Sequence, residues 1–332
     1  MGSLQLFPHI KFPLPSQYTI SFSCNLQHLL SPCNRTNTNR CIDSKIKQAK
    51  VVLCSSQQQE VEEHSEEEEF QVLTAIQSSY NHIVILDTPK SRLLLLDSTN
   101  NVHSIFNKGS KWTGSYWDEF ATLPPMVPRG PIAIFGLGGG TAAHLMLELW
   151  PSLQLEGWEI DEILIDKARD YLGLTDLEKQ NMAGGVLNVH IGDVFSSSVA
   201  IPGGYAGIIV DLFSDGKVLP QLQEASTWLE LNNRLKSNGR FMVNCGAGED
   251  GLSEINDAVS QNEDLSMDGT WEINATIKAL CKAFPGQVNW KKMPKSAGEN
   301  YLALTGPLAD MATWSADLPP ELSSSVHQWR TC

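Results

Sequence analysis

The residues best suited to hold a small ligand are three glycines, Gly136, Gly138 and Gly140, that follow a short apolar run and precede a helical pattern. This order predicts a β-strand, a tight turn and a helix, which form the first part of a β-α-β unit. Glycines let the backbone approach a ligand closely, and the N–H groups at the start of a helix can face polar ligand atoms. A turn with a purely structural role is the alternative.

Carboxylates stand where later strands of such a unit would end. Glu159 lies about twenty residues beyond the turn, where an acid can accept hydrogen bonds from both hydroxyls of a ribose. Asp193 and Asp211 each end a further apolar run. Because the carboxyl ends of parallel strands meet at one edge of a sheet, we expect these side chains to converge on one pocket. The pattern predicts a site for a nucleoside-bearing cofactor.

The third glycine of the dinucleotide fingerprint is missing, because Thr141 takes its place. A ligand such as S-adenosylmethionine has ribose hydroxyls but no pyrophosphate, so it suits this turn better than NAD does. We therefore expect S-adenosylmethionine or a close relative as the cofactor. A dehydrogenase is the weaker alternative, and detectable NAD binding would revive it.

Strand and helix patterns alternate after residue 131, which predicts an α/β fold with a Rossmann-like parallel sheet. Three short runs before it predict a small antiparallel β domain. We expect strands at 82–87, 92–97 and 102–106, and helices at 141–149, 162–172, 228–235 and 271–284. The predicted divisions are the β domain at 71–110, the Rossmann-like domain at 111–310 and a C-terminal tail at 311–332. The acidic stretch 246–270 predicts either a solvated insertion or a flexible lid that attracts a cationic substrate.

The first 54 residues contain six basic residues and one acid, with many Ser, Thr, Asn and Pro. Such an acid-poor, hydroxyl-rich stretch is typical of an organelle transit peptide, and residues 51–54 look like a plastid processing site. We expect import into the chloroplast stroma; a disordered cytosolic tail is the alternative. Residues 55–70 are rich in Gln and Glu, which predicts a solvated acidic linker.

The whole chain of 332 residues has a net charge of −14, which argues against nucleic acid as the main partner and leaves cationic small molecules open. No apolar run reaches the roughly eighteen residues of a membrane helix, so we expect no membrane partner. Cys245, Cys281 and Cys332 show no pairing or metal spacing. We expect no metal site.

Several motifs resemble those of the spermidine synthase family, the polyamine aminopropyltransferases, over about residues 78–305. The family's Glu-Ile-Asp tripeptide matches residues 159–161, and its Leu-Asp-Gly turn matches residues 96–98. Its Tyr-x-Glu helix matches residues 116–118, with Leu-Pro following at unchanged spacing. The resemblance implies the sheet of the class I S-adenosylmethionine-dependent methyltransferases, in a divergent plastid-targeted plant member.

The resemblance implies a role for each matched position. Glu159 would hold the ribose and Asp193 the adenine amino group. Asp211 would act as the general base on an attacking amine, and Tyr116 would line the amine channel. A helix cap or turn is the alternative for Asp211. Asp161 would also bind the cofactor. Asp118 and Asp215 would contact the substrate.

The chain departs from the family at the places that select its substrates. The family's glycine loop carries an aspartate where this chain has Gly139. That aspartate would repel the carboxylate of intact S-adenosylmethionine, so its loss removes the electrostatic reason to choose the decarboxylated form. Phe213 places an apolar group where a diamine would be held. The diamine segment is replaced by one carrying Lys291, Lys292 and Lys295.

We therefore expect a transferase that binds S-adenosylmethionine or a relative and moves a methyl or alkyl group to an amine or another small acceptor. The first alternative is a diverged aminopropyltransferase that uses decarboxylated S-adenosylmethionine and a diamine. The second is a non-catalytic binding or assembly protein that keeps the fold, with a homodimer through the β domain left open.

Overall fold

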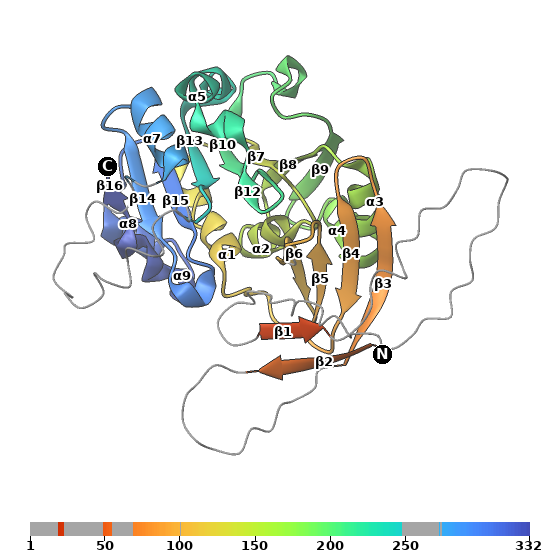
Figure 1. Ribbon diagram of the computed structural model, residues 1–332. Helices are drawn as coiled ribbons and strands as arrows, with labels where there is room; N and C mark the ends of the chain where they lie inside the picture. The colour runs from red at the N-terminus through yellow and green to blue at the C-terminus, as the bar shows by residue number, and fades with distance from the viewer. Residues whose placement is uncertain (1–18, 23–48, 55–68, 100, 248–271, 273) are drawn as a thin grey trace, which may run out of the picture.

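The computed structural model describes residues 19–22, 49–54, 69–99, 101–247, 272 and 274–332. In this part of the chain, a six-stranded antiparallel sheet precedes an eight-stranded mixed sheet (Figure 1). Helices cover both faces of the larger sheet. The predicted α/β architecture, a Rossmann-like sheet after a small antiparallel sheet, is confirmed.

The larger sheet runs in the order β16-β14-β15-β13-β10-β7-β8-β9. Strands β13, β10, β7, β8 and β9 are parallel, whereas β15, β14 and β16 continue the sheet in antiparallel fashion. The strands are β7 (Ile132–Phe135), β8 (Gln154–Glu159), β9 (Val186–Ile191), β10 (Tyr205–Val210), β13 (Leu235–Asn244), β14 (Val288–Lys292), β15 (Tyr301–Thr305) and β16 (Arg330–Thr331).

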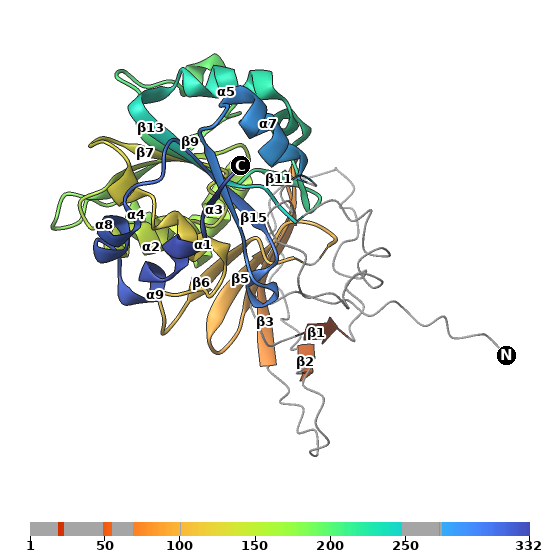
Figure 2. The ribbon, with the colours of Figure 1, turned by 90° about the vertical axis from the view of Figure 1, so that its left-hand side faces the viewer.

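The helices divide into two groups according to the face of the sheet that they cover. Strand β7 explains why both faces need cover: Ile132 and Ile134 belong to one core, while Ala133 and Phe135 belong to the other. Figure 2 shows α5 and α7 together, away from α1 and α2. The helices are α1 (Tyr116–Phe120), α2 (Thr141–Leu149), α3 (Glu162–Tyr171), α4 (Leu174–Leu177), α5 (Ala225–Asn232), α7 (Ala275–Ala283), α8 (Met311–Ala316) and α9 (Pro320–Ser323). Short 3₁₀ turns are η2 (Pro124–Met126), η3 (Ser197–Val199), η4 (Pro220–Gln223), η7 (Lys295–Ala297) and η8 (Ser325–Gln328).

The strand order reverses between β7 and β10. From β7 the chain adds β8 and β9 on one side, and then returns to place β10 and β13 on the other. Ligands of open α/β sheets bind beyond the carboxyl ends of the strands at such a switch point. Gly136 follows β7 and Asp211 follows β10 at this place. The topology therefore sets the glycine turn beside the predicted general base.

The smaller sheet has the strand order β1-β2-β3-β4-β5-β6. Its last three strands lie close to the predicted positions. The sequence pattern did not predict β3, which begins at Glu69, the last residue of the Glu-rich stretch. The strands are β1 (Thr19–Phe22), β2 (Ala49–Cys54), β3 (Glu69–Gln77), β4 (His82–Asp87), β5 (Ser91–Leu95) and β6 (Ser104–Asn107).

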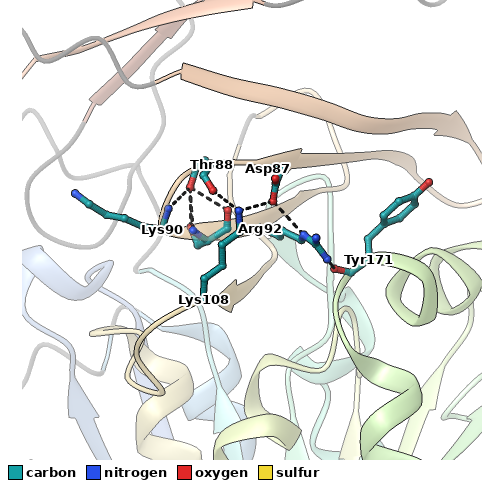
Figure 3. A network of polar contacts seen from close by, with 7 residues as sticks. Asp87, Thr88, Lys90, Arg92, Lys108 and Tyr171 are labelled. Carbon is teal, nitrogen blue, oxygen red and sulfur yellow. Dashed lines mark hydrogen bonds and ion pairs between the residues drawn. The ribbon is translucent and has the colours of Figure 1, made fainter. Parts of the chain in front are cut away.

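Polar contacts fasten the smaller sheet to the larger domain, as Figure 3 shows. The Arg92 guanidinium donates to the Asp87 carboxylate at 3.0 Å and to the backbone carbonyl of Tyr171 at 2.7 Å, at the end of α3. The Lys108 ammonium completes the cluster, 2.8 Å from Asp87. These charges lie at the surface, so they fix the orientation of the sheet more than they add stability.

The N-terminal predictions meet the structure only in part. Strands β1 and β2 lie within the predicted transit peptide 1–54, and β2 pairs with β3 through Ala49 opposite Phe70. The first strands of the sheet therefore precede residue 70, where the sequence placed the start of the fold. Removal of 1–54 on import stays a prediction. The predicted linker 55–70 and insertion 246–270 lie almost wholly outside the described residues.

The predicted C-terminal tail, 311–332, is folded onto the larger domain. Trp314 and Trp329 are buried, and β16 pairs with β14 as an additional edge strand. Indole rings bury a large apolar area, which accounts for the docking of these short helices. The helix predicted at 228–235 has the expected length but begins and ends earlier, as α5 (Ala225–Asn232), whereas the helix predicted at 271–284 is shorter, as α7 (Ala275–Ala283). No helix in the described ranges is long and apolar enough to cross a membrane.

A buried ion pair ties this C-terminal segment to α1. The Lys291 ammonium on β14 lies 2.6 Å from the Glu119 carboxylate, which also accepts a hydrogen bond from the Ser325 hydroxyl at 3.0 Å. The Trp329 ring lies 5.4 Å from the same ammonium. Moving α1 away would separate the pair and leave a buried charge uncompensated, which is energetically costly. These contacts therefore hold α1 in one position.

Candidate functional site

A cavity of about 540 Å³ opens beyond the carboxyl ends of the parallel strands, between the two sheets. The smaller sheet, α1 and the loop after β13 form its other walls. Most of the predicted site residues line it: Tyr116, Gly136, Gly138, Glu159, Asp193 and Asp211. Its size suits a nucleoside-bearing cofactor with a small co-substrate.

The glycine turn needs its glycines for two separate reasons. Gly136 and Gly138 have φ values of +85° and +55°, a region that other residues rarely adopt. A Cβ on Gly136 would also lie 2.2 Å from the backbone oxygen of Asp211. Gly140 lies at the N-cap of α2 with φ +85° and serves to start the helix. The turn can therefore approach the end of β10 without a side chain between them.

The position of Gly139 bears on cofactor choice. Its N–H donates to the Ser104 hydroxyl at 2.8 Å, and a Cβ there would lie 2.5 Å from Leu172 and 2.8 Å from the Ser104 Cβ. Ser104 on β6 thus fills the space that a side chain at position 139 would take. At this place the Gly139 N–H is paired with a neutral hydroxyl, and position 139 itself carries no carboxylate.

The Glu159 carboxylate is anchored at the end of β8. It accepts hydrogen bonds from the N–H groups of Gly138 at 3.0 Å and Ile160 at 2.9 Å. Burial raises the pKa of Glu159, and these donors oppose the rise. The carboxylate thus connects the glycine turn to the second strand, where ribose hydroxyls can reach it. Asp193, after β9, is exposed at the cavity wall and accepts a hydrogen bond from the Phe195 N–H at 2.9 Å.

Asp211 lies at the end of β10 with both carboxylate oxygens engaged. Oδ2 accepts a hydrogen bond from the Tyr116 hydroxyl at 3.1 Å, and Oδ1 accepts one from the Asn244 amide at 2.9 Å. Burial raises the pKa of Asp211 to about 6, although both donors lower it. A carboxylate with such a pKa is ionised near neutral pH and basic enough to accept a proton during a reaction. The two residues predicted to be catalytic, Asp211 and Tyr116, thus lie in contact at the cavity.

Three predicted acids do not line the cavity, and each has a structural task instead. Asp161 is buried, caps α3 through the Leu164 N–H and accepts hydrogen bonds from Ser78 and Asn81. It therefore joins α3 to the turn between β3 and β4. Residues two apart on one strand would share a face, but β8 ends at Glu159 and Asp161 is already the N-cap of α3, so the tripeptide does not place both acids in the site.

Asp118 and Asp215, the acids predicted to contact the substrate, do not line the cavity. The buried Asp118 carboxylate accepts hydrogen bonds from the Thr113 and Gly114 N–H groups, which closes the turn before α1. Asp215 is exposed with φ +49°, and Gly216 has φ +70°. Together they form the two-residue turn between β11 (Phe213–Ser214) and β12 (Lys217–Val218). The Asp-Gly dipeptide is itself typical of such a hairpin turn. The family resemblance instead suggested a substrate-binding role for Asp215.

The three lysines that replace the family's diamine segment separate in the structure. Lys291 is buried in its pair with Glu119, and Lys292 is exposed with its ammonium over the Tyr301 ring. Only Lys295 lines the cavity, at an exposed position on η7. The segment therefore places less positive charge at the cavity than the sequence suggested, and it opposes a cationic substrate less strongly.

Two polar side chains of the cavity, Asn244 and His103, were not among the predicted site residues. Asn244 ends β13 as Asp211 ends β10, so the strand-end rule that found the acids would have found it. His103 comes from the smaller sheet, and its Nε2 lies 3.2 Å from the Asp97 carboxylate. Burial alone would raise the pKa of Asp97, but hydrogen bonds from His103 and Thr99 outweigh it and bring the pKa to about 2. Only the docking of the two sheets brings His103 to the cavity.

The fold and the site define a Rossmann-like α/β protein with a carboxylate-lined cavity at the strand switch point. In the described residues, no group of three or more His, Cys, Asp or Glu side chains could hold a metal ion.

Comparisons with known proteins place the chain further. It is 25% identical over 185 residues to a probable polyamine aminopropyl transferase of Bifidobacterium longum, a match that covers 55% of this chain and 40% of the relative. The chain thus matches less than half the length of that relative. No family model matches.

The solved structures share the fold. A probable spermidine synthase from Corynebacterium glutamicum aligns with a TM-score of 0.52 and 14% identity, covering 74% of this chain and 86% of that one. A spermidine synthase in complex with the transition-state analogue AdoDATO aligns with a TM-score of 0.52 and 17% identity, over 76% and 78% of the two chains. The chain is thus spermidine-synthase-like, and the resemblance inferred from its motifs is confirmed.

Proposed function

We propose that this protein is a transferase that binds S-adenosylmethionine or a derivative and transfers a carbon group from its sulfonium to a small amine. The observation that carries the proposal is Asp211, a carboxylate with a pKa of about 6 held at the cavity by Tyr116 and Asn244. Glu159 and the glycine turn would bind the nucleoside, and Asp193 would contact the adenine.

The proposed reaction follows from these positions. The amine nitrogen attacks the carbon next to the sulfonium, its lone pair forms the new C–N bond, and the C–S bond breaks. The electrons of that bond stay on sulfur, which becomes a neutral thioether. Asp211 accepts the proton that the amine must lose. The carboxylates of the cavity also favour a cationic donor and a cationic acceptor electrostatically.

We propose intact S-adenosylmethionine as the preferred donor, because the glycine turn offers no carboxylate at position 139. The neutral Ser104 side chain fills the space that a side chain at position 139 would take, so no charge at that position would repel a donor carboxylate. Aminopropyl transfer from decarboxylated S-adenosylmethionine is the second candidate. The similarity to a polyamine aminopropyl transferase favours it. The described cavity wall also carries only one lysine, Lys295, so it offers little positive charge to repel a diamine.

A transfer assay tests the proposal. The full chain is incubated with either donor and a panel of mono- and diamines, and the thioether product is quantified. S-adenosylhomocysteine identifies methyl transfer, and methylthioadenosine identifies aminopropyl transfer. Asp211→Asn should lose at least a hundredfold in rate with either donor. A protein that binds a donor but forms neither thioether would favour the binding or assembly alternative.

A further inference from the structure

Two cysteines far apart in the sequence meet at the edge of the larger sheet. Cys281 lies on α7 and Cys332 follows β16, and their sulfur atoms are 2.6 Å apart. A disulfide bond is about 2.05 Å long, so the two atoms are closer to bonding distance than non-bonded sulfurs normally come. The Cys332 N–H donates to the Val288 carbonyl on β14 at 3.0 Å, which fixes its backbone beside the sheet. The sequence spacing had suggested no pairing.

The two thiols can be reached from solvent, in contrast to that of Cys245. Cys281 is half-buried and Cys332 is exposed. The hydrogen-bond contact with the Cys332 sulfur lowers the pKa of Cys281, which favours the nucleophilic thiolate. Cys245 is buried, and burial raises the pKa of its thiol. The pair therefore has one reactive thiol, one partner thiol and an inert neighbour.

We propose that Cys281 and Cys332 form a redox-active dithiol, a site of disulfide formation by exchange with a low-molecular-weight disulfide. The Cys281 thiolate attacks the external disulfide and forms a mixed disulfide, and one external thiolate leaves. Cys332 gives its proton to that thiolate and attacks the Cys281 sulfur, which releases the second external thiolate; this thiolate takes up from water the proton that Cys281 had lost. The two cysteines are oxidised by two electrons in total, and one external disulfide is reduced to two thiols.

The bridge would close the part of the chain that holds α1 in place. Between the two cysteines lie β14 with Lys291 and the C-terminal segment with Ser325, the two residues that hold Glu119. Glu119 is one turn along α1 from Tyr116, which contacts Asp211. Oxidation would therefore restrict unfolding of the segment that supports one wall of the cavity.

Redox titration of the full chain tests this inference without any activity measurement. The protein is equilibrated in mixtures of reduced and oxidised glutathione, alkylated, digested and analysed by mass spectrometry. We expect peptides containing Cys281 and Cys332 to be joined with loss of both thiol hydrogens. Closing a loop of 51 residues should also raise the melting temperature by roughly 5 °C or more under oxidising conditions.

Two variants give the matched comparison. Cys281→Ser should abolish both the linked peptide and the difference in melting temperature between oxidised and reduced protein. Cys245→Ala should keep both, whatever its own effect on stability. If both thiols of the wild-type protein are alkylated in every glutathione mixture, or carry only separate glutathione adducts, the proposed dithiol is overturned.

Discussion

The hydroxyl of Tyr116 donates a hydrogen bond to the carboxylate of Asp211, 3.1 Å away, and so joins α1 to the end of β10. The carboxylate's other oxygen is held by Asn244 from the neighbouring strand. Burial raises the pKa of Asp211 to about 6 against the effect of both donors. The helix over the mouth of the sheet thus tunes the group that we propose as the general base.

The transfer rate should fall in acid with an apparent pKa near 6, because Asp211 accepts the amine proton only when ionised. Tyr116→Phe removes a donor to the carboxylate, so the acid limb of kcat/KM should move up by roughly one pH unit. Tyr205→Phe is the matched control, since its hydroxyl donates to the Val199 carbonyl away from Asp211. A limb that shifts equally in both variants would contradict this role for Tyr116.

The raised pKa of Asp211 also predicts a stability effect. The folded protein keeps the proton at pH values where the unfolded chain, with a pKa near 3.8, has lost it. This group therefore lowers the free energy of unfolding as the pH rises from about 4 to about 6. Asp211→Asn should be more stable than the wild type by about 1–2 kcal/mol at pH 8, with the gain vanishing below pH 4. Urea unfolding at both pH values measures it, and a variant less stable at pH 8 would sink the idea.

Glu159 and Asp161 belong to one tripeptide but should respond differently to loss of charge. Glu159→Gln should weaken donor binding at least tenfold, since charge-assisted hydrogen bonds to ribose hydroxyls are lost. Asp161→Asn should leave the Kd within about threefold but lower the free energy of unfolding by about 1–2 kcal/mol, because its contacts with Ser78 and Asn81 are structural. Binding by calorimetry and stability by urea unfolding separate the two. Equal binding losses would return Asp161 to the cofactor site.

Much of the larger domain could be predicted because its signals are local. The apolar run before Gly136 and the spacing to Glu159 both lie within one β-α-β unit. Strand-end placement then brought Asp211 to the same pocket through topology alone. The architecture and the two carboxylates at its centre follow from these patterns.

The remaining features depend on contacts between distant segments. His103 reaches the cavity only because the smaller sheet docks. Trp314 becomes part of the core only because α8 lies where its indole N–H can donate to the Thr122 carbonyl, beyond the end of α1. Asp118 resembles a family site residue, yet Thr113 and Gly114 satisfy its carboxylate. Family motifs placed such residues near the site but did not show what occupied their hydrogen-bonding groups.

The glycine turn allows a test of close approach that is separate from backbone strain. Gly136→Ala should cost several kcal/mol in stability or abolish donor binding, because the Cβ would collide with the Asp211 carbonyl at 2.2 Å. Gly203→Ala is the control: its φ of +80° carries similar strain, but among the described atoms nothing lies within 4 Å of the new Cβ. That variant should lose only about 1–2 kcal/mol. Thermal unfolding and calorimetry compare the pair, and equal losses would mean that strain alone requires Gly136.

The most direct test of the proposed function is calorimetric titration of the full chain with S-adenosylmethionine and with its decarboxylated form. We predict that both bind at the Glu159 site, with the intact cofactor bound at least tenfold more tightly because position 139 carries no carboxylate. Glu159→Gln should weaken both. Tighter binding of the decarboxylated form would contradict the donor preference and favour aminopropyl transfer, and binding of neither would contradict the transferase itself.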